Sequence, residues 1–464
     1  MIDDRYELLI IGAGPAGMAA ACEAASHGVR VAVLDNQAAP GGQIYRNVDR
    51  ATNRQNRILG KDFVKGRSLV EQFIQSGGSY FPGSTVWFLD EKRRVGVLID
   101  DKSFFVDADK LLLAAGAQER PMPIKGWQLP GVMTAGAGQI LLKSAGMVPN
   151  GRLVLAGSGP LLLLLAYQYL QAGVKIDALI ETTPRGAISR SLGKLFEALP
   201  ATDYLLKGVK MMLAVRRAGI PVYHGVEGLS AIGEEKLEAV RFDTGKTGFK
   251  KVTDCELRAD TLLLHQGVIS NIRLPLAAGC EIEWDAGQKN WAVTNDEWGR
   301  SSDADIYVVG DGSRISGAEA SALQGRLAGM HASHQLGKIS DSKLEVLSGP
   351  VVKSRKRHLS IRPFLDSCYT PSPRYLVPGD DTLVCRCEEI TAGEIRQAVR
   401  LGCTGPNQVK SFTRCGMGPC QGGQCGSTVS LIIAEQLDKP MAEIGCLRVR
   451  PPLSPITLGQ LSKA

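Results

Sequence analysis

The sequence predicts an α/β protein with two parallel-sheet domains followed by a small, mostly helical domain. Three observations predict this fold. A glycine-rich turn, GAGPAG, follows an apolar run near residue 12, and a second turn, GSGP, follows another apolar run near residue 157. Cysteines then crowd between Cys385 and Cys425. Each turn is typical of a strand that leads into a helix, and the cysteine spacing is typical of a metal site.

The composition limits the classes of protein to which the chain can belong. With 464 residues, 44% of them hydrophobic and 22% charged, it can bury a globular core. Its net charge of +7 comes without a dense Lys/Arg tract, so nucleic acid is not an expected partner. The longest apolar run, around residues 161–166, is far shorter than the roughly 18 residues of a membrane span. Because the N-terminal residues are acidic and unlike a secretory signal, we expect a cytoplasmic protein without a membrane span.

The first glycine-rich turn has the spacing of a dinucleotide-binding site. A predicted strand over residues 7–11 precedes the turn, a helix reaching His27 follows it, and a second strand over 29–34 ends at Asp35. Asp35 stands about 20 positions after Gly12, where a carboxylate binds the ribose of adenosine. Phosphates are expected at the N-terminus of the helix, where free amides and the helix dipole favour anions.

Three later segments complete the predicted first site, and the last two of them favour FAD over NAD. The loop PGGQIYR suits a segment that closes over a bound cofactor. The AAGA segment after the apolar strand at 110–113 resembles the part that closes the first half of the FAD domain in two-dinucleotide-fold flavoproteins. In DIYVVGDG, Asp311 is placed to bind ribityl hydroxyls, and a helix over 317–333 would favour an anionic reduced flavin. The predicted residues are Gly12, Gly14, Pro15, Ala16, Gly17, Asp35, Gly42, Gln43, Arg46, Ala115, Gly116, Gly310 and Asp311.

The second glycine-rich turn departs from the dinucleotide pattern. Gly157 and Gly159 precede a predicted helix, but Leu162 occupies the third glycine position. A strand over 175–180 ends at Glu181, where NAD sites hold a ribose hydroxyl. Gly157, Gly159 and Glu181 are therefore candidate nucleotide-binding residues. A NAD(P) site, a site for another adenine nucleotide such as ATP, and a vestigial fold remain open alternatives.

Four cysteines near the C-terminal end form the predicted metal site. Cys385 and Cys387 make a C-x-C pair, and Cys420 and Cys425 follow a little over thirty residues later. Four thiolates suit a 2Fe-2S cluster. A structural zinc site is the alternative, and Cys415 is a rival ligand because it also forms a C-x4-C pair with Cys420.

The residues between and after these cysteines predict helices. Thr391 and Glu394 form a T-x-x-E capping box that begins a helix reaching residue 401, and another helix is expected from Cys425 to Leu437. The first 380 residues contain no CxxC pair, so disulfide reductase activity is not expected. Six scattered histidines form no catalytic constellation, and no catalytic residue is predicted in this chain.

Taken together, these motifs resemble one family. GAGPAG, GGQIYR, AAGAQERPMPIKGWQLPGV, GSGP, VGDG, CRCEE, GMGPCQGGQCG and RVRPPLSPITLG are similar to the alpha subunits of heteromeric FAD-dependent amino-acid dehydrogenases. That family includes opine oxidases, D-hydroxyproline dehydrogenases and the hydrogen cyanide synthase flavoprotein subunit. The C-terminal part resembles bacterioferritin-associated ferredoxin, whose last ligand pair corresponds to Cys420 and Cys425. Leu162, and Ser270 where related flavoproteins usually have proline, are departures.

The resemblance implies a fold, cofactors and partners. The fold is an α/β, Rossmann-like flavoprotein with two dinucleotide-binding domains and a 2Fe-2S domain. The predicted divisions are 1–125 with 255–340 for FAD, 126–254 for the second nucleotide domain, 341–380 as a linker, 381–437 for the cluster and 438–464 as a tail. The implied partners are a downstream electron acceptor, a small ferredoxin-like gamma subunit, and an FAD-containing oxidase-like beta subunit. Some relatives place FMN between subunits or carry ATP where others carry FAD.

The main functional hypothesis is an electron-transferring subunit of a dehydrogenase for the C–N bond of an amino acid or a secondary amine, such as an opine or hydroxyproline. Substrate oxidation would occur on the beta subunit. The flavin and cluster would convert a two-electron process into one-electron steps. The alternatives are a stand-alone NAD(P)H-dependent flavin/2Fe-2S reductase, a hydrogen cyanide synthase subunit oxidising glycine, and a non-catalytic scaffold.

Overall fold

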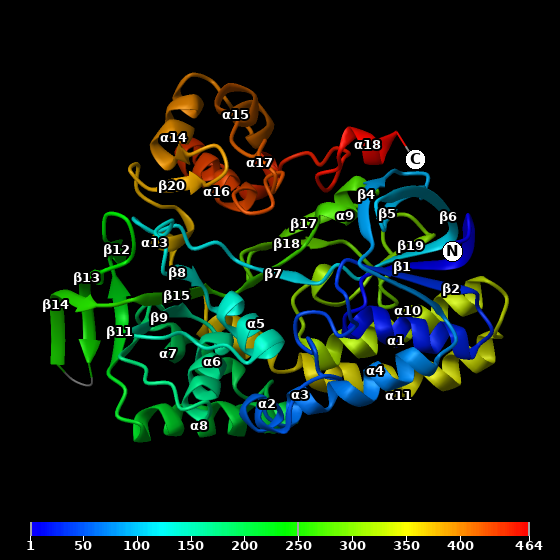
Figure 1. The fold of residues 1–464 in the computed structure, drawn as a ribbon, viewed down its shortest axis with the longest axis horizontal. Coiled ribbons are helices and arrows are strands. Elements are labelled where there is room, and N and C mark those ends of the chain that lie inside the picture. The colour runs from blue at the N-terminus through cyan, green and yellow to red at the C-terminus, as the bar shows by residue number, and fades with distance from the viewer. Residues whose placement is uncertain (1, 248–249, 463–464) are drawn as a thin grey trace.

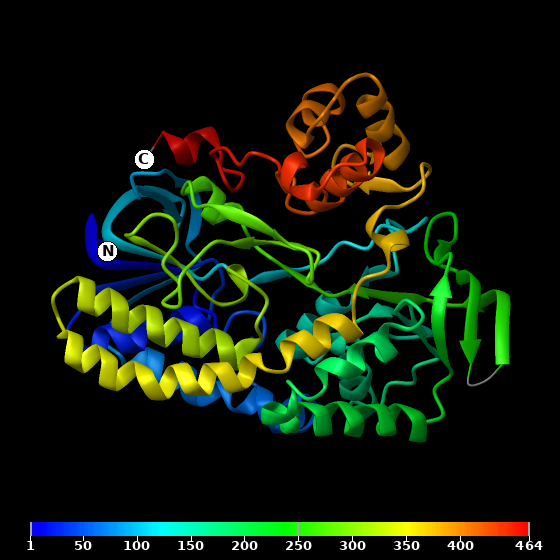
Figure 2. The same cartoon turned by 180° about the vertical axis from the view of Figure 1, so that it is seen from behind.

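The computed structural model of the chain describes residues 2–247 and 250–462. Two sheets with helices packed on them form the body of the molecule, and a small helical domain lies along one side of both (Figures 1 and 2). No helix in the described part of the chain is both long and apolar enough to cross a membrane.

The first sheet contains the N-terminal strand and the strand before Asp311. Parallel strands are β3 (Ser79–Pro82), β2 (Val31–Asp35), β1 (Arg5–Ile11), β6 (Lys102–Leu113) and β19 (Ile306–Val308), and β5 (Val95–Ile99) and β4 (Thr85–Leu89) continue from β6 as an antiparallel edge. Helices α1 (Pro15–Ser26), α4 (Gly66–Gln75) and α10 (Ala318–Gln335) pack together against it. A Cβ on Gly325 of α10 would lie 2.0 Å from the Ala16 carbonyl oxygen, so a glycine is required where α10 crosses α1.

The second sheet has a parallel half and an antiparallel half. The parallel strands are β8 (Val132–Thr134), β15 (Thr261–Gln266), β9 (Leu153–Ser158), β10 (Ala178–Glu181) and β11 (Val222–Glu227), and β13 (Ala239–Thr247), β12 (Ser230–Ile232) and β14 (Lys250–Arg258) form the antiparallel half. Helices α5 (Ala135–Ala145), α6 (Pro160–Gln171), α7 (Ala187–Ser191) and α8 (Thr202–Arg217) belong to this part of the molecule. Both glycine-rich turns thus follow buried parallel strands, as the sequence predicts.

Two of the predicted divisions differ from the structure. The return to the first domain was predicted at residue 255, yet β14 and β15 still belong to the second sheet, because the buried run Leu262–Leu264 pairs in parallel with β9. The predicted linker 341–380 is largely helical, with α11 (Asp341–Leu359), α12 (Arg362–Cys368) and α13 (Pro373–Leu376). Leu344 and Val351 of α11 are buried against α10, which explains why this charged segment is ordered.

A two-stranded ribbon joins the two sheets. Strand β7 (Ala117–Glu119) leaves the first domain and β16 (Val268–Ser270) returns to it, and the two pair antiparallel. The buried Arg120 side chain donates hydrogen bonds to three backbone carbonyls, those of Gln266, Gln288 and Lys289. Because burial lowers the pKa of Arg120 only to about 10, this side chain is still charged at neutral pH. The buried Arg120 cation therefore holds the ribbon at the point where the chain passes between the two sheets.

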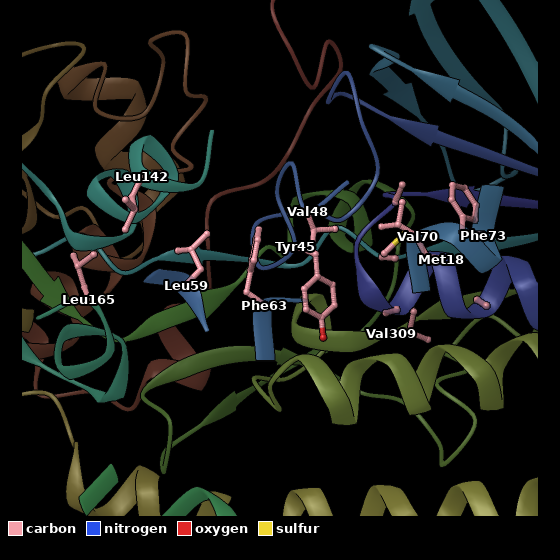
Figure 3. Close-up of a cluster of buried hydrophobic side chains, with 14 of the residues drawn as sticks. Met18, Tyr45, Val48, Leu59, Phe63, Val70, Phe73, Leu142, Leu165 and Val309 are labelled. Carbon is pink, nitrogen blue, oxygen red and sulfur yellow. The ribbon is translucent and has the colours of Figure 1, made fainter. Parts of the chain in front are cut away.

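A continuous apolar core spans the two domains. Helices α2 (Asn53–Leu59) and α3 (Lys61–Val64) lie between them and contribute Leu59 and Phe63. Leu142 and Leu165 from the second domain lie on one side of these residues, and Met18 of α1 lies on the other (Figure 3). The two domains are consequently expected to unfold together.

The small domain is mostly helical and is followed by a tail that returns to the first domain. It contains β20 (Leu383–Cys385), β21 (Ile390–Thr391), α14 (Ala392–Arg400), α15 (Pro406–Thr413), α16 (Gly426–Leu437) and α17 (Met441–Ile444). The capping box predicted at Thr391 and Glu394 is present at the start of α14. In the tail, Leu453 is buried in the core of the first sheet and its amide donates to the Trp87 carbonyl oxygen over 2.6 Å, before α18 (Leu458–Leu461) ends the described chain.

Candidate functional site

The first glycine-rich turn is tightly packed against its own strand and helix. A Cβ on Gly12 would lie 2.4 Å from the Ala114 carbonyl oxygen, and a Cβ on Gly17 would lie 1.8 Å from the Gly12 carbonyl oxygen. Gly14 is the N-cap of α1, no side chain caps this helix, and Pro15 follows as the first helical residue. The N-terminal amides of α1 therefore face a position where an anion can bind.

Asp35 is held at the end of β2 by the backbone of the same turn. Its carboxylate accepts hydrogen bonds from the Ala13 amide over 2.5 Å and from the Gln37 amide over 2.7 Å. Burial raises the pKa of Asp35, and these two amides oppose that rise. Each carboxylate oxygen has a further lone pair, so the group can still accept a ribose hydroxyl.

The predicted closing loop lies directly over the turn. A Cβ on Gly42 would approach the Gly14 Cα to 2.9 Å, so these two backbones are in contact. The Arg46 guanidinium donates to Gln37 over 2.6 Å and to Gln43 over 3.1 Å, while its Nε is buried without a partner among the described residues. An unpaired guanidinium N–H is a group that can donate to a phosphate oxygen.

Two residues outside the predicted set hold this loop in place. The Tyr45 ring is buried against Gly66 at the start of α4, and a Cβ there would lie 2.2 Å from the ring. Lys143 of α5 is buried and donates to the Gln43 carbonyl over 3.0 Å and to Gln139 over 2.9 Å. Burial, with a smaller contribution from Arg46, lowers the pKa of Lys143 to about 7. The signal for Tyr45 was its place inside the GGQIYR motif.

The remaining predicted residues of the first site meet at the ends of β6 and β19. A Cβ on Gly310 would lie 2.9 Å from the Ala16 Cβ, and a Cβ on Gly312 would lie 3.0 Å from the Gly116 amide and 3.5 Å from the Ala115 amide. These segments are too close to admit side chains, which suits a cradle for a flat cofactor. Asp311 Oδ1 accepts from the Ser316 amide over 2.7 Å and from the Gly317 amide over 2.8 Å, so this carboxylate also organises the turn into α10.

A histidine side chain lies against the second glycine-rich turn. A Cβ on Gly157 would lie 1.7 Å from the His265 carbonyl oxygen, and a Cβ on Gly159 would lie 2.8 Å from His265 Nε2. His265 is 2% exposed, and its Nδ1 lies 2.5 Å from Glu119 Oε1. The imidazole thus lies against the face of Gly159. In the sequence His265 is one of six scattered histidines, and its place in the buried strand β15 is the signal that sets it apart.

The other two residues of the second site, Glu181 and Leu162, both contact groups of the protein itself. Glu181 Oε2 lies 2.5 Å from His224 Nδ1, and this hydrogen bond raises the pKa of His224. Leu162 is 4% exposed and belongs to the core shared by the two domains. The residue at the third glycine position therefore fills space in the interior.

Five cysteines gather at one end of the small domain, and all are free thiols. The sulfurs of Cys385, Cys415 and Cys425 lie within 4.8 Å of one another. The sulfurs of Cys387 and Cys420 lie 3.8 Å apart. The structure thus brings together the four predicted ligands and also the rival, Cys415.

The geometry of this cluster fits a thiolate-bound metal site. Two thiolates on one tetrahedral ion with bonds of about 2.3 Å lie about 3.8 Å apart. Hydrogen bonds from Cys415 and Cys425, and from the Gly416 and Glu388 amides, lower the pKa of Cys385, while the same sharing raises the pKa of Cys415 and Cys425. Buried sulfurs that compete for one negative charge can all ionise only beside a cation. A pair and a trio of sulfurs suit the two irons of a 2Fe-2S cluster, and a single zinc would use four of them.

Glycines determine the shape of the loop that carries Cys420 and Cys425. A Cβ on Gly418 would lie 2.2 Å from the Cys387 Cβ, and a Cβ on Gly422, whose φ is +76°, would lie 2.4 Å from Leu447 Cδ1. The loop ends at Cys425, the N-cap of α16. The GMGPCQGGQC motif is therefore explained by close packing around the sulfurs.

The cysteine domain is docked onto the ribbon between the two sheets. Gln118 of β7 donates from Nε2 to the Gly423 carbonyl over 2.5 Å, and Gly423 lies between Cys420 and Cys425. The Trp127 indole donates to the Leu383 carbonyl over 2.7 Å. Since Gln118 stands two residues after Gly116, the ribbon links the flavin-type site to the cysteine loop.

These features define a two-dinucleotide-fold flavoprotein with an added cysteine domain. Residues 6–337 match the family model described as pyridine nucleotide-disulphide oxidoreductase, and residues 380–464 match the one described as sarcosine oxidase A3 domain. The chain is 44% identical to a subunit of opine oxidase from Agrobacterium tumefaciens over 99% of its own length and 92% of that protein. It is 31% identical to a hydrogen cyanide synthase subunit of Pseudomonas aeruginosa over 97% of this chain and 96% of that one.

The chain belongs to the pyridine nucleotide-disulphide oxidoreductase family and, within it, to the branch of these opine oxidase subunits. It is an oxidoreductase subunit, and the family match implies that the two-sheet body binds FAD. The crystal structure of L-proline dehydrogenase from P. horikoshii has the same fold, with a TM-score of 0.67 at 19% identity over 98% of this chain and 79% of that one. The predicted family and fold class are confirmed, while the assignment of individual ligand residues stays a prediction.

Proposed function

We propose that this chain is the electron-transferring subunit of a heteromeric dehydrogenase that oxidises the C–N bond of an amino acid or a secondary amine such as an opine. In this proposal the substrate is oxidised on a partner FAD subunit. FAD in the first site would exchange two electrons, and a 2Fe-2S cluster in the cysteine domain would exchange one at a time.

One observation carries the proposal: the Gln118–Gly423 hydrogen bond connects the segment that closes the flavin-type site to the loop between two cluster cysteines. The chain between Gly116 and Gln118 is short, and the ribbon around it is fixed by Arg120. This arrangement suits transfer between two cofactors that stay in place. The chain's own residues bind and orient both groups, and the partner supplies the substrate pocket.

The identities to the relatives support the substrate class. Three opine oxidase subunits are 41–44% identical to the chain, whereas two hydrogen cyanide synthase subunits are 29–31% identical. A secondary amine of the opine type is therefore proposed ahead of glycine. The relatives named as subunits also support an oxidase-like partner, with a ferredoxin-like third subunit and an external electron acceptor as further proposed components.

The ligand set of the cluster can be tested with cysteine variants. In anaerobically purified chain we expect two irons and two sulfides per protein, with the EPR signal of a reduced 2Fe-2S cluster after dithionite. Cys387→Ser or Cys420→Ser should lose this signal. Cys415→Ser is the matched control. It removes a cysteine sulfur from the same group of five but should leave the iron content unchanged. Zinc in place of iron, without an EPR signal, would contradict the proposed relay.

Three further measurements separate the proposal from its alternatives. Co-expression with a candidate oxidase-like subunit should yield a complex that reduces an external acceptor when an opine is added. A chain that forms no such complex would contradict its proposed place in a heteromeric enzyme.

NADH should not bleach the flavin of the isolated chain, because His265 lies against Gly159 of the second site. Rapid bleaching would favour the stand-alone reductase, and release of ATP instead of FAD on denaturation would reassign the first site.

A further inference from the structure

Arg273 lies where the ribbon, the cysteine loop and the C-terminal tail meet. It is the first residue of α9 (Arg273–Ala277), three residues after β16 ends. A small cavity of about 70 Å³ is bordered here by Gln118, Arg273, Gln421 and Gly423. None of the sequence motifs includes this arginine, and the proposed function does not use it.

The Arg273 side chain is half-buried and packs against the loop that carries Cys420 and Cys425. A Cβ on Gly423 would lie 3.7 Å from Arg273 Cδ and 3.8 Å from its Nη1, so the loop backbone rests on this side chain. Arg273 Nη2 donates to the Leu453 carbonyl of the tail, and Nε has no hydrogen-bond partner among residues 2–247 and 250–462. The side chain thus contacts the loop backbone and keeps one N–H unpaired.

No carboxylate of the described chain neutralises this cation. Burial lowers the pKa of Arg273, and the charged group that opposes this effect is Cys420. Arginine is effectively always protonated in proteins, so Arg273 carries its charge beside the cysteine loop. A half-buried cation without a carboxylate partner therefore places an uncompensated positive charge beside the cysteine loop.

We propose that Arg273 is the counter-charge of the cysteine-bound cluster and raises its reduction potential. The inference rests on the proposed 2Fe-2S cluster. Each electron that enters a thiolate-bound cluster adds a negative charge, and a nearby cation in a medium of low dielectric favours the reduced state. Arg273 acts here as a positioning residue, because it contacts the loop between two ligands rather than the irons. Its effect should favour electron flow from flavin to cluster.

The test is a redox titration of the intact complex monitored by EPR. In Arg273→Gln, the charge is lost, and we expect the cluster to become at least tenfold harder to reduce relative to a fixed donor. For a one-electron couple this tenfold change equals a shift of about 59 mV to more negative potential. Arg273→Met should shift the potential in the same direction, because it keeps the apolar stem without the charge, and it serves if the glutamine variant fails to fold. Arg273→Lys should retain most of the wild-type potential.

A matched control removes a docking contact without changing a charge. Trp127→Phe loses the hydrogen bond to the Leu383 carbonyl but keeps a ring beneath Arg386, and its cluster potential should equal that of the wild type. Unchanged potentials in both neutral variants would overturn the inference, as would an equal shift in Arg273→Lys, which would indicate a structural role. A wild-type chain that holds iron and shows a cluster signal keeps the proposed function intact in either case. A wild-type chain with no cluster signal would overturn both.

Discussion

The two glycine-rich turns occupy equivalent places in their sheets but differ in what lies against them. At the first turn, α1 begins at Gly14 without a side-chain cap among the described residues, and the Asp35 carboxylate accepts from the backbone amides of Ala13 and Gln37. At the second turn, His265 lies against Gly159, and Glu181 is hydrogen-bonded to His224. Helix α6 likewise begins without a side-chain cap, so the two turns differ in the imidazole beside Gly159 and in the side-chain partner of Glu181, and not in their helix N-termini.

The second strand-turn-helix unit can therefore serve the packing of the core even though its candidate ribose ligand, Glu181, is paired with another side chain. Leu162 shows this most directly, because it fills the core shared by both domains at the position where a nucleotide-binding turn has glycine. If the two turns differ in this way, substitutions at the first should change cofactor content, and substitutions at the second should change stability alone.

Adding one methyl group to the first turn should have the most severe consequence. In Gly17→Ala the new Cβ would lie 1.8 Å from the Gly12 carbonyl oxygen, so α1 must move away from β1. We expect a loss of roughly 2–4 kcal/mol in the free energy of unfolding and a purified protein without flavin. Thermal denaturation and the absorption spectrum measure the two effects. Gly159→Ala is the control at the second turn, and it should cost stability while flavin content stays normal.

Restoring the missing glycine tests the second turn. Leu162→Gly removes a buried side chain from α6 and should cost about 3–5 kcal/mol, measured by urea denaturation, while flavin content is kept. It should not create affinity for NADH, because His265 still lies against Gly159. Leu161→Gly carries the same helix penalty at a less buried position and should cost only about 1 kcal/mol. Tight NADH binding by the Leu162 variant would contradict the view that His265 closes this site.

A smaller change is expected at Lys143, the link from the second domain to the loop of the first site. Its folded pKa of about 7 lies well below that of an unfolded lysine, so the unfolded state binds more protons between about pH 7 and 10. Stability should therefore rise with pH across that range and level off below it. Lys143→Met should flatten this slope in urea denaturation curves, and the exposed Lys175→Met should keep it. An unchanged slope in the Lys143 variant would contradict its assignment.

Glu181 and His224 at the second turn should contribute least. Because the hydrogen bond to Glu181 raises the pKa of His224, the pair stabilises the fold below about pH 6.5 and loses this contribution as pH rises through the folded pKa. The His224 side chain is 57% exposed, so the energy is at most about 1 kcal/mol. In Glu181→Gln, an NMR titration should show the pKa of His224 falling toward its ordinary value. If that pKa does not move, Glu181 remains available to a ligand.

Local patterns predicted the elements around both turns and two helices of the cysteine domain, α14 and α16. The capping box at Thr391 and the helix after Cys425 are examples, since their signals lie within a few residues of each other. The contacts that join distant segments were not predictable in this way. His265 meets Gly159 only because β15 lies beside β9, and Arg273 meets the cysteine loop only because α9 packs near residue 423. The helical state of residues 341–359 depends on packing against α10, which its own charged composition hides.

The return of the tail to the first sheet has a further consequence for the cysteine domain. That domain is attached at one end through α11 to α13 and at the other through Leu453, which is buried beside Trp87. A module tethered at both ends meets its docking surface at a high effective concentration, on the order of millimolar for short linkers. A few weak contacts, such as those of Gln118 and Trp127, are then enough to keep it bound. Cutting the chain after residue 446 should therefore weaken docking more than the loss of any one of these contacts.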